Sequence, residues 1–404
     1  MSTTVTSRPG IIHFVLALGG FAIGTAEFST MSLLPYLAHD LQISVPVAGH
    51  VISAYALGVV VGAPLIAVLS ARLPRSTLLI ALMGLYALAN GLSAVAPNYR
   101  WMLGFRFISG LPHGAYFGIA MLVAASVVPA NQRARALGHV LLGLTVATIV
   151  GVPLANWMGQ VIGWRWCFGV VATLALATAI LVAMFVPKMR RDKGASPSRE
   201  LGALKRGQVW LTLAIGAVGF GGVFAVYTYL ASTLMAVTAV SARMVPMVFA
   251  AFGVGMTAGN IIVPYFADRA VMRAAGWLLL GSAVTLALYP VAAPRLGTVT
   301  LDVMAIGFCG ALATVLQTRL MDVAGDAQSL AAALNHSAFN VANALGPWFG
   351  GLAIAAGFGW TSTGWVGCGL ALGGFAAWVI ASITDRRPYA SVDHGGPPAR
   401  NSRV

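Results

Sequence analysis

Charge is what this sequence lacks most. Lys, Arg, Asp and Glu together make up only 8% of its 404 residues, whereas apolar residues make up 59%. Mean hydropathy is +0.86. Soluble domains carry about 25% charged residues. A chain this poor in charge cannot cover a water-exposed surface, so we expect most of its surface to face lipid.

Residues used by redox, metal and nucleotide sites are also scarce. The three cysteines (Cys167, Cys309 and Cys368) lie in or beside apolar stretches at no ligand spacing, so we expect neither a disulfide framework nor a metal site. None of the three lysines follows a glycine, which excludes the phosphate loop of ATPases. We therefore expect no enzyme, no metal and no cofactor, and any uphill transport must be driven by an ion gradient.

Long apolar runs replace the missing charge. Each is long enough to span a bilayer, and lipid leaves no partner for open backbone groups, so the runs predict helices. The period-2 alternation of an outer-membrane barrel is absent. The sequence predicts an all-α membrane protein with twelve spans, at 11–37, 47–69, 77–96, 101–128, 136–161, 166–186, 209–235, 244–266, 274–293, 299–318, 328–356 and 361–383.

Landmarks of the first half recur about 197 residues later. Leu137 and His139 recur as Leu334 and His336 at this offset. Chance is the alternative, but agreement of separate landmarks favours two pseudo-symmetric six-helix bundles, an arrangement typical of transporters. The repeated glycines indicate close helix packing, because small residues let two helices approach each other. The fullest repeat is Gly58, Gly62 and Arg72 against Gly255, Gly259 and Arg269.

Domain boundaries follow from the polar segments. Residues 1–10 form an N-terminal tail and 11–187 the first bundle. A charged linker occupies 188–208, the second bundle 209–384, and a disordered polar tail 385–404. We expect a monomer.

Positive charge is distributed unevenly over the two sides. With both termini on one side, that side holds nineteen of the Lys and Arg residues and the other side four. The positive-inside rule then places both termini in the cytoplasm. Nucleic-acid binding is the alternative explanation of the net charge of +14, but the charges are scattered among short loops. The expected partner is the lipid bilayer, not nucleic acid.

Two charges lie deep inside predicted spans. Glu27 and Arg106 both fall in the outer half of the membrane, whereas Asp302 is shallow. Charges at such depth normally face a partner or a wet cavity. A buried carboxyl beside a cation can alternate between holding a proton and facing the cation, which predicts proton coupling. The alternative is a static ion pair that braces two helices.

Motifs around these two charges resemble those of a known family. The run from Gly24 to Phe28 contains Glu27, and Pro35 follows it. The run from Arg106 to Gly114 is similar to a fourth-helix motif whose Arg is implicated in proton coupling. Together they resemble twelve-span drug:proton antiporters of the major facilitator superfamily, in the arabinose-efflux and chloramphenicol-resistance-like branch. The resemblance implies proton-driven export of a small solute, such as a drug or sugar, by alternating access.

Two further motifs of that family are partly present. Gly151 with Pro153, and more closely Gly346 with Pro347, match the antiporter motif. The gating loop between the second and third helices departs from the family pattern, because its Asp and both Gly are missing. The gating residues that remain are Arg72 and Arg75 in the first half and Asp268 and Arg269 in the second.

The resemblance also implies that helices one, four, seven and ten line a cavity. Aromatic and histidine side chains could contact substrate there or only pack helices together. A polar stripe of His336, Asn340 and Asn343 favours helix packing over substrate contact. The substrate-cavity residues we expect are His113, Tyr116, Phe117, Phe220, Phe224 and Tyr227.

These observations predict a multi-pass secondary transporter of a bacterial inner membrane that exports a small molecule against protons. One rival is a uniporter or proton symporter for sugars or nucleosides with the same fold. The other is a membrane enzyme or receptor, for which the loops are too short.

Overall fold

The structure is a computed structural model that describes residues 9–69, 73–129, 132–187, 204–267, 270–324 and 328–385. Helices make up nearly all of these residues. The first half contains α1 (Pro9–Ser32), α2 (Leu34–Asp40), α3 (Val45–Leu69), α4 (Arg75–Ala94), α5 (Tyr99–Ser126), α6 (Arg133–Val146), η2 (Ala147–Gly151), α7 (Val152–Val161) and α8 (Trp164–Phe185).

The second half repeats this pattern. It contains α10 (Gly207–Gly219), α11 (Gly221–Ala236), η4 (Ala242–Met244), α12 (Val245–Ala267), α13 (Val271–Ala292), α14 (Leu296–Cys309), α15 (Leu312–Ala324), α16 (Gln328–Ala353), η5 (Ile354–Phe358) and α17 (Ser362–Thr384). Within the described residues, twelve helical segments are long and apolar enough to cross a membrane, as the sequence predicted. Several spans combine two helices: α10 with α11, and α14 with α15.

Local sequence explains where several helices begin and bend. Asn98 caps α5 by accepting hydrogen bonds from the backbone of Arg100 at 3.1 Å and Trp101 at 3.3 Å. The span of α14 and α15 is longer than predicted, because the chain turns at Gly310 and resumes as a helix. A one-turn π-helical segment, η2, lies before Pro153 on α7, where the proline ring removes a backbone donor.

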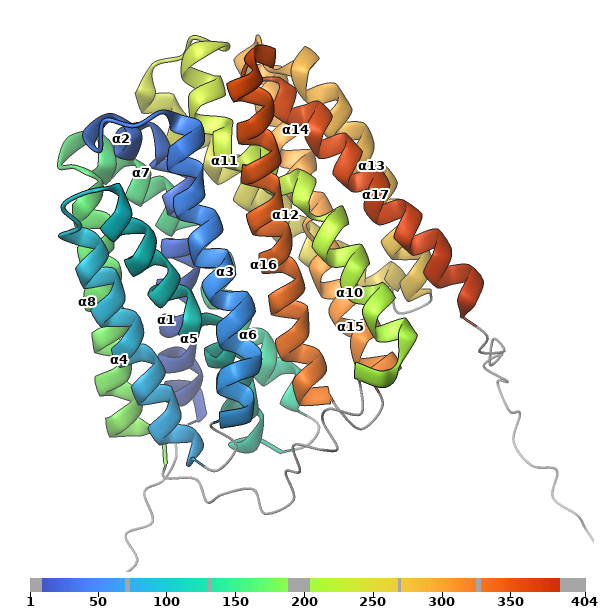
Figure 1. The fold of residues 1–404 in the computed structure, drawn as a ribbon. Coiled ribbons are helices and arrows are strands. Elements are labelled where there is room, and N and C mark those ends of the chain that lie inside the picture. The colour runs from blue at the N-terminus through green and yellow to red at the C-terminus, as the bar shows by residue number, and fades with distance from the viewer. Residues whose placement is uncertain are drawn as a thin grey trace, which may run out of the picture.

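The two halves lie side by side, with α1–α8 on the left of Figure 1 and α10–α17 on the right. Their internal packing repeats at the predicted offset. A Cβ on Gly58 would overlap the carbonyl oxygen of Phe107, and one on Gly255 would overlap that of Met304, 197 residues later in both cases. Gly110 against Tyr55 and Gly307 against Phe252 are a second such repeated contact. The repeat seen in the sequence is therefore a repeat of helix contacts.

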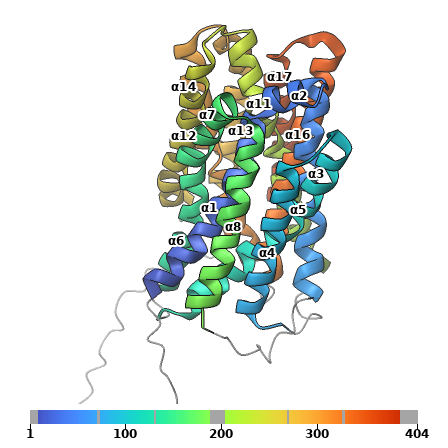
Figure 2. The same cartoon turned by 90° about the vertical axis from the view of Figure 1, so that its left-hand side faces the viewer.

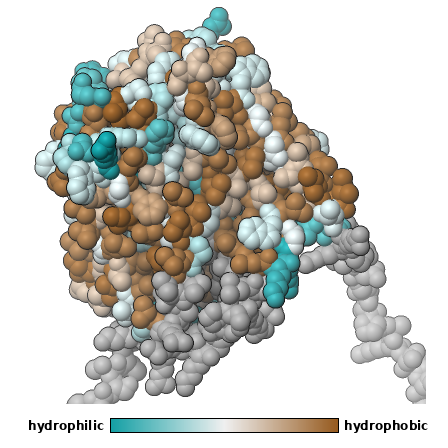
Figure 3. Space-filling view, viewed as in Figure 1, coloured by the Kyte–Doolittle hydropathy of each residue, from teal (hydrophilic) through white to brown (hydrophobic). Residues whose placement is uncertain are grey.

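Large apolar side chains cover much of the exterior. Leu57, Leu88, Leu176, Ile261 and Trp277 are all more than half exposed. Figure 3 shows brown, apolar residues over the middle of the visible face and more polar residues toward the upper end. Such a band is costly in water and favourable in lipid, so the exterior matches the composition.

We call the end that carries α2 the outer end, following the orientation predicted from charge. It is the upper end in Figures 1 and 2, and α1 begins at the opposite end. The two halves contact each other toward the outer end. Gln160 on α7 donates to Ala242 O at 2.9 Å, and Ser53 on α3 donates to Ala344 O at 3.2 Å. A crevice of about 760 Å³ remains between the halves there, lined by Tyr36, Trp157, Gln160, Val161, Ser241, Ala242, Arg243 and Pro246.

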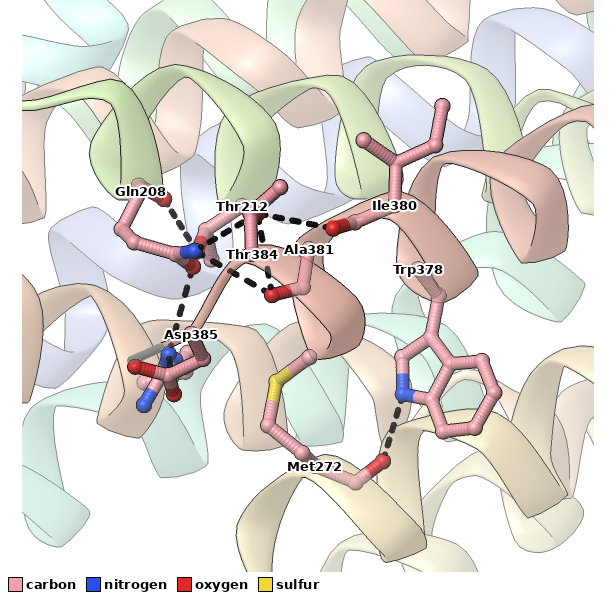
Figure 4. A network of polar contacts seen from close by, with 9 residues as sticks. Gln208, Thr212, Met272, Trp378, Ile380, Ala381, Thr384 and Asp385 are labelled. Carbon is pink, nitrogen blue, oxygen red and sulfur yellow. Dashed lines mark hydrogen bonds and ion pairs between the residues drawn. The ribbon is translucent and has the colours of Figure 1, made fainter. Parts of the chain in front are cut away.

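At the inner end, the second half is held together by a network around Arg319. The sequence placed this arginine in a loop, but it lies on α15 and is 8% exposed. It donates to Gln208 on α10 at 3.3 Å and to Asp385 after α17 at 2.5 Å. Gln208 in turn donates to Ala381 O and to the Thr384 hydroxyl (Figure 4). Three helix ends are thereby joined.

Candidate functional site: a buried acid between the two halves

Glu27 lies on α1, at the contact between the two halves. Its side chain is 7% exposed. Its Oε1 accepts a hydrogen bond of 3.0 Å from Nδ2 of Asn343 on α16, which belongs to the opposite half. The Oδ1 atom of Asn343 is buried and has no partner among the described residues. This contact places the carboxyl where movement of one half against the other must change its surroundings.

Arg106 on α5 is 1% exposed and lies close to Glu27 without forming an ion pair. The two charges interact electrostatically, but the ion pairs of the described residues do not include them. The guanidinium carbon lies 4.2 Å from the ring centre of Tyr55 and 5.3 Å from that of Phe168. One amino group points to Ala26 O at 3.5 Å, while Nε and Nη1 have no described partner. The rings, not a carboxylate, hold the guanidinium in place.

A hydrogen-bonded network centred on Tyr55 lies beside Arg106, whose guanidinium stacks on the Tyr55 ring. The Tyr55 hydroxyl lies 3.2 Å from that of Tyr86 and 2.9 Å from Nδ1 of His113. The His113 ring is 6.1 Å from the ring of His336 on the opposite half. The sequence analysis missed Tyr55 and Tyr86, because an isolated tyrosine in an apolar span does not by itself indicate a functional position.

The other residues predicted on α5 behave differently from one another. Tyr116 faces α1, where its hydroxyl donates to Leu16 O at 2.8 Å. It therefore packs inside the first half. Phe117 stacks on His336 with ring centres 5.3 Å apart. His113 and Phe117 thus lie at the contact between the halves and Tyr116 does not.

The predicted aromatic stripe of the second half meets α1 beside Glu27. Phe28 stacks on Phe224 at 6.3 Å and meets Tyr227 edge-on at 5.8 Å. Phe220 contacts Phe224 at 5.3 Å between ring centres, so the three predicted residues form one cluster. The Tyr227 hydroxyl is buried without a described partner. The cluster places apolar rings and one free hydroxyl next to the acid.

The stripe of His336, Asn340 and Asn343 runs along the face of α16 that meets the first half. Packing was the favoured interpretation, and His336 does pack on Phe117. Asn343, however, contacts Glu27 directly. Asn340 donates to the backbone of its own helix at 3.0 Å, and its Oδ1 has no described partner. Spacing on one helix could not reveal which residue of another helix it would meet.

The antiporter-motif residues lie at matching helix contacts. A Cβ on Gly151 would overlap the Thr25 side chain of α1. A Cβ on Gly346 would overlap the backbone of Gly221 on α11. Pro153 lies in the first turn of α7, and Pro347 lies within α16, where its carbonyl accepts from Tyr229 at 2.8 Å. Gly151, Gly346 and Pro347 therefore join the first helix of a half to its fifth helix.

Of the predicted gating residues, only Arg75 falls within the described residues. It is the first residue of α4. Arg72, Asp268 and Arg269 lie outside the described residues. Their gating role stays a prediction.

Comparison with known families decides the class of protein. The family model described as Major Facilitator Superfamily matches residues 16–300 of this chain. The chain belongs to the major facilitator superfamily. Members of this superfamily are transporters, so the chain is a multi-pass transport protein and not an enzyme. The family and fold predicted from the motifs are confirmed.

Individual relatives agree with this superfamily. Inner membrane transport protein YdhP of Escherichia coli K12 is 41% identical over 349 residues, covering 86% of this chain and 89% of that protein. Chloramphenicol resistance protein of Streptomyces lividans is 33% identical, covering 83% and 86%. A crystal structure of nucleoside transporter NupG superposes with a TM-score of 0.72 over 92% of this chain and 99% of that one. At 12% identity, this likeness shows the fold alone.

Proposed function

We propose that the chain is a proton-coupled exporter of a small solute in the bacterial inner membrane. Protons enter as the solute leaves, and both termini face the cytoplasm. Relatives described as an inner membrane transport protein and a chloramphenicol resistance protein support the location and the direction. The observation that carries the proposal is the hydrogen bond between Glu27 and Asn343 across the two halves.

This hydrogen bond ties the protonation of Glu27 to the contact between the halves. An ionised carboxyl accepts the Asn343 amide N–H strongly, because hydrogen bonds to charged groups are roughly twice as strong as neutral ones. A protonated carboxyl accepts more weakly at that oxygen. Loss of the proton therefore favours the observed arrangement, in which the outer ends are in contact. Binding of a proton weakens the contact and favours separation of the outer ends.

Arg106 makes the ionised state of Glu27 possible at this depth. A lone carboxylate in an apolar site would keep its proton, since removing an unpaired charge from water is costly. The nearby guanidinium offsets that cost electrostatically while staying stacked on Tyr55. Because the two groups are not paired, the proton does not have to displace an ion-pair partner.

The aromatic cluster beside Glu27 supports contact with a flat, partly apolar solute. Phe28, Phe224 and Tyr227 offer ring faces, and the Tyr227 hydroxyl offers a hydrogen bond. Aromatic side chains with one polar tip suit such solutes.

A transport assay tests the proposal. A growth screen of a deletion strain against sugars, nucleosides and antibiotics, chloramphenicol among them, first selects the solute. Everted vesicles then measure its uptake under an imposed pH gradient. Glu27→Gln should abolish gradient-driven uptake while counterflow exchange persists, because exchange needs no net proton movement. Glu200→Gln makes the same chemical change at the other glutamate and should transport normally.

Two outcomes would contradict the proposal. One is full gradient-driven uptake by a correctly inserted Glu27→Gln variant. The other is transport by the unaltered protein that an uncoupler leaves unchanged, which would indicate a uniporter. Uptake that runs with the proton in the same direction would indicate a symporter.

A further inference from the structure

A second acid with a buried carboxylate oxygen lies in the other half of the molecule, although its side chain as a whole is partly exposed. Asp302 is on α14, and its Oδ2 atom is buried without a hydrogen-bond partner among the described residues. The sequence suggested a shallow, unremarkable position near the helix end. Burial of a carboxylate oxygen without a donor is costly, however, even at the edge of the bilayer.

Asp302 faces the junction of α14 with α13 and α11. The nearby Tyr289 on α13 is 0% exposed, and its hydroxyl also has no described partner. The Asp302 carboxyl interacts electrostatically with this hydroxyl, and the side chain of Thr233 on α11 lies beside it. Thr233 itself donates to Tyr229 O at 3.0 Å. Polar groups from three helices therefore meet beside Asp302, and none of the described residues donates a hydrogen bond to its Oδ2 atom.

No described cation balances this carboxylate. Arg295 is exposed just before α14, and the ion pairs of the described residues join other groups. Among the titratable residues, Tyr289 on α13 is the neighbour of Asp302, and Cys309 lies two turns further along α14. The outer part of α12 carries no charged side chain. One carboxyl and two hydroxyls are too few oxygens for a metal cation, which takes about six or more. A proton is the ligand that fits.

The depth of the site identifies the side from which it is reached. Asp302 lies six residues from the start of α14, or ~9 Å along the helix. Tyr289 and Thr233 each lie three residues from the outer ends of α13 and α11. Glu27 lies five residues from the outer end of α1, at a similar depth in the opposite half. Each half therefore holds one acid near the outer end.

We propose that Asp302 binds a proton from the outer side of the membrane and forms a second protonation site, separate from Glu27. The proton removes the uncompensated charge of the second half. A low pH on the outer side of the membrane thereby protonates one acid in each half, Glu27 in the first and Asp302 in the second. The Asp302 site does not depend on the exporter role proposed for the chain.

Carbodiimide labelling tests the proposal without a transported solute. N,N′-dicyclohexylcarbodiimide reacts with protonated carboxyls in apolar surroundings, and mass spectrometry reads each labelled position separately. In right-side-out vesicles, labelling of Asp302 should be more than tenfold greater at an outer pH of ~5 than of ~9, because the protonated fraction of a carboxyl falls steeply as the pH rises above its pKa. Asp302→Asn should lose that label and keep the label on Glu27.

Asp40 is the matched control. It lies at the outer end in a solvent-exposed ion pair with Arg165, so it should stay unlabelled, because the carbodiimide labels carboxyls in apolar surroundings. Absence of label on Asp302 at every pH, while Glu27 is labelled, would overturn the proposal. So would labelling that follows the inner pH when the outer pH is held constant. Failure of Glu27 to label would instead count against the exporter mechanism and leave the Asp302 result readable.

Discussion

At the residue scale, Arg106 separates a coupling role from a structural one. A brace requires the guanidinium and the carboxylate to bond directly. The guanidinium instead stacks on Tyr55 at 4.2 Å and interacts with Glu27 at longer range. The aromatic ring holds the guanidinium in position. Its positive charge therefore remains available to interact with the Glu27 carboxyl.

Substitutions at Arg106 test this assignment in everted vesicles with an imposed pH gradient. Arg106→Ala should abolish gradient-driven transport, because the proton on Glu27 would no longer be released. Arg106→Lys keeps the charge but loses the planar stacked group, a loss of ~1–2 kcal/mol, so transport should be partial. The double variant Glu27→Gln with Arg106→Gln should insert normally and remain inactive. Recovery of gradient-driven transport in that double variant would establish the brace.

At the element scale, the repeated glycines determine how closely helices approach. In each half, glycines lie directly against carbonyl oxygens of a neighbouring helix; Gly58 against Phe107 and Gly255 against Met304 are one such matched pair. Small residues let backbones approach in lipid, where no hydrophobic force draws helices together. Any side chain at these positions must push two helices apart.

Substitution of the paired glycines by alanine should destabilise both halves to a similar degree. Gly58→Ala and Gly255→Ala should each cost ~1–3 kcal/mol, since the added methyl overlaps backbone that cannot rotate away. Gly84 on α4 has no neighbour within 4 Å of the Cβ position, so Gly84→Ala should be neutral or stabilising. Thermal unfolding in detergent, followed by tryptophan fluorescence, measures all three. A loss at Gly84 equal to that at Gly58 would contradict the close-contact explanation.

At the scale of the whole molecule, the fold brings the start of α1 and the end of α17 toward one end (Figure 1), and the charge rule predicts that this end faces the cytoplasm. Nineteen of the Lys and Arg residues fall on one side of the predicted topology and four on the other. In the structure, α1 begins and α17 ends toward the same end (Figure 1), while the ion pair of Asp40 with Arg165 lies at the opposite end. The positive end should therefore face the cytoplasm.

Reporter fusions test this orientation. A phosphatase that is active only outside the cytoplasm should be inactive when fused at position 390. The same enzyme fused after Pro97, between α4 and α5, should be active because that turn lies at the outer end. High activity at position 390 with low activity after Pro97 would reverse the assignment.

The sequence by itself was enough to predict the membrane environment, the twelve helices and the two-fold repeat. Each follows from local properties: apolar runs long enough to span lipid, and landmarks at one offset. The burial of Glu27 and Arg106 could also be predicted, because a charge in an apolar helix is visible without knowing its neighbours. The predicted end of the tenth span at residue 318 was wrong, since α15 continues through Arg319 to Ala324.

Only the tertiary structure decided which groups meet. Asn343 belongs to a stripe typical of packing, and nothing in its own helix indicates that it donates to Glu27, 316 residues away. Tyr55 under Arg106 and Tyr289 beside Asp302 are likewise contacts between helices. Periodicity determines which face of a helix is polar, because it depends on neighbours along the chain. The partner of that face depends on how whole helices pack, which is a property of the folded molecule.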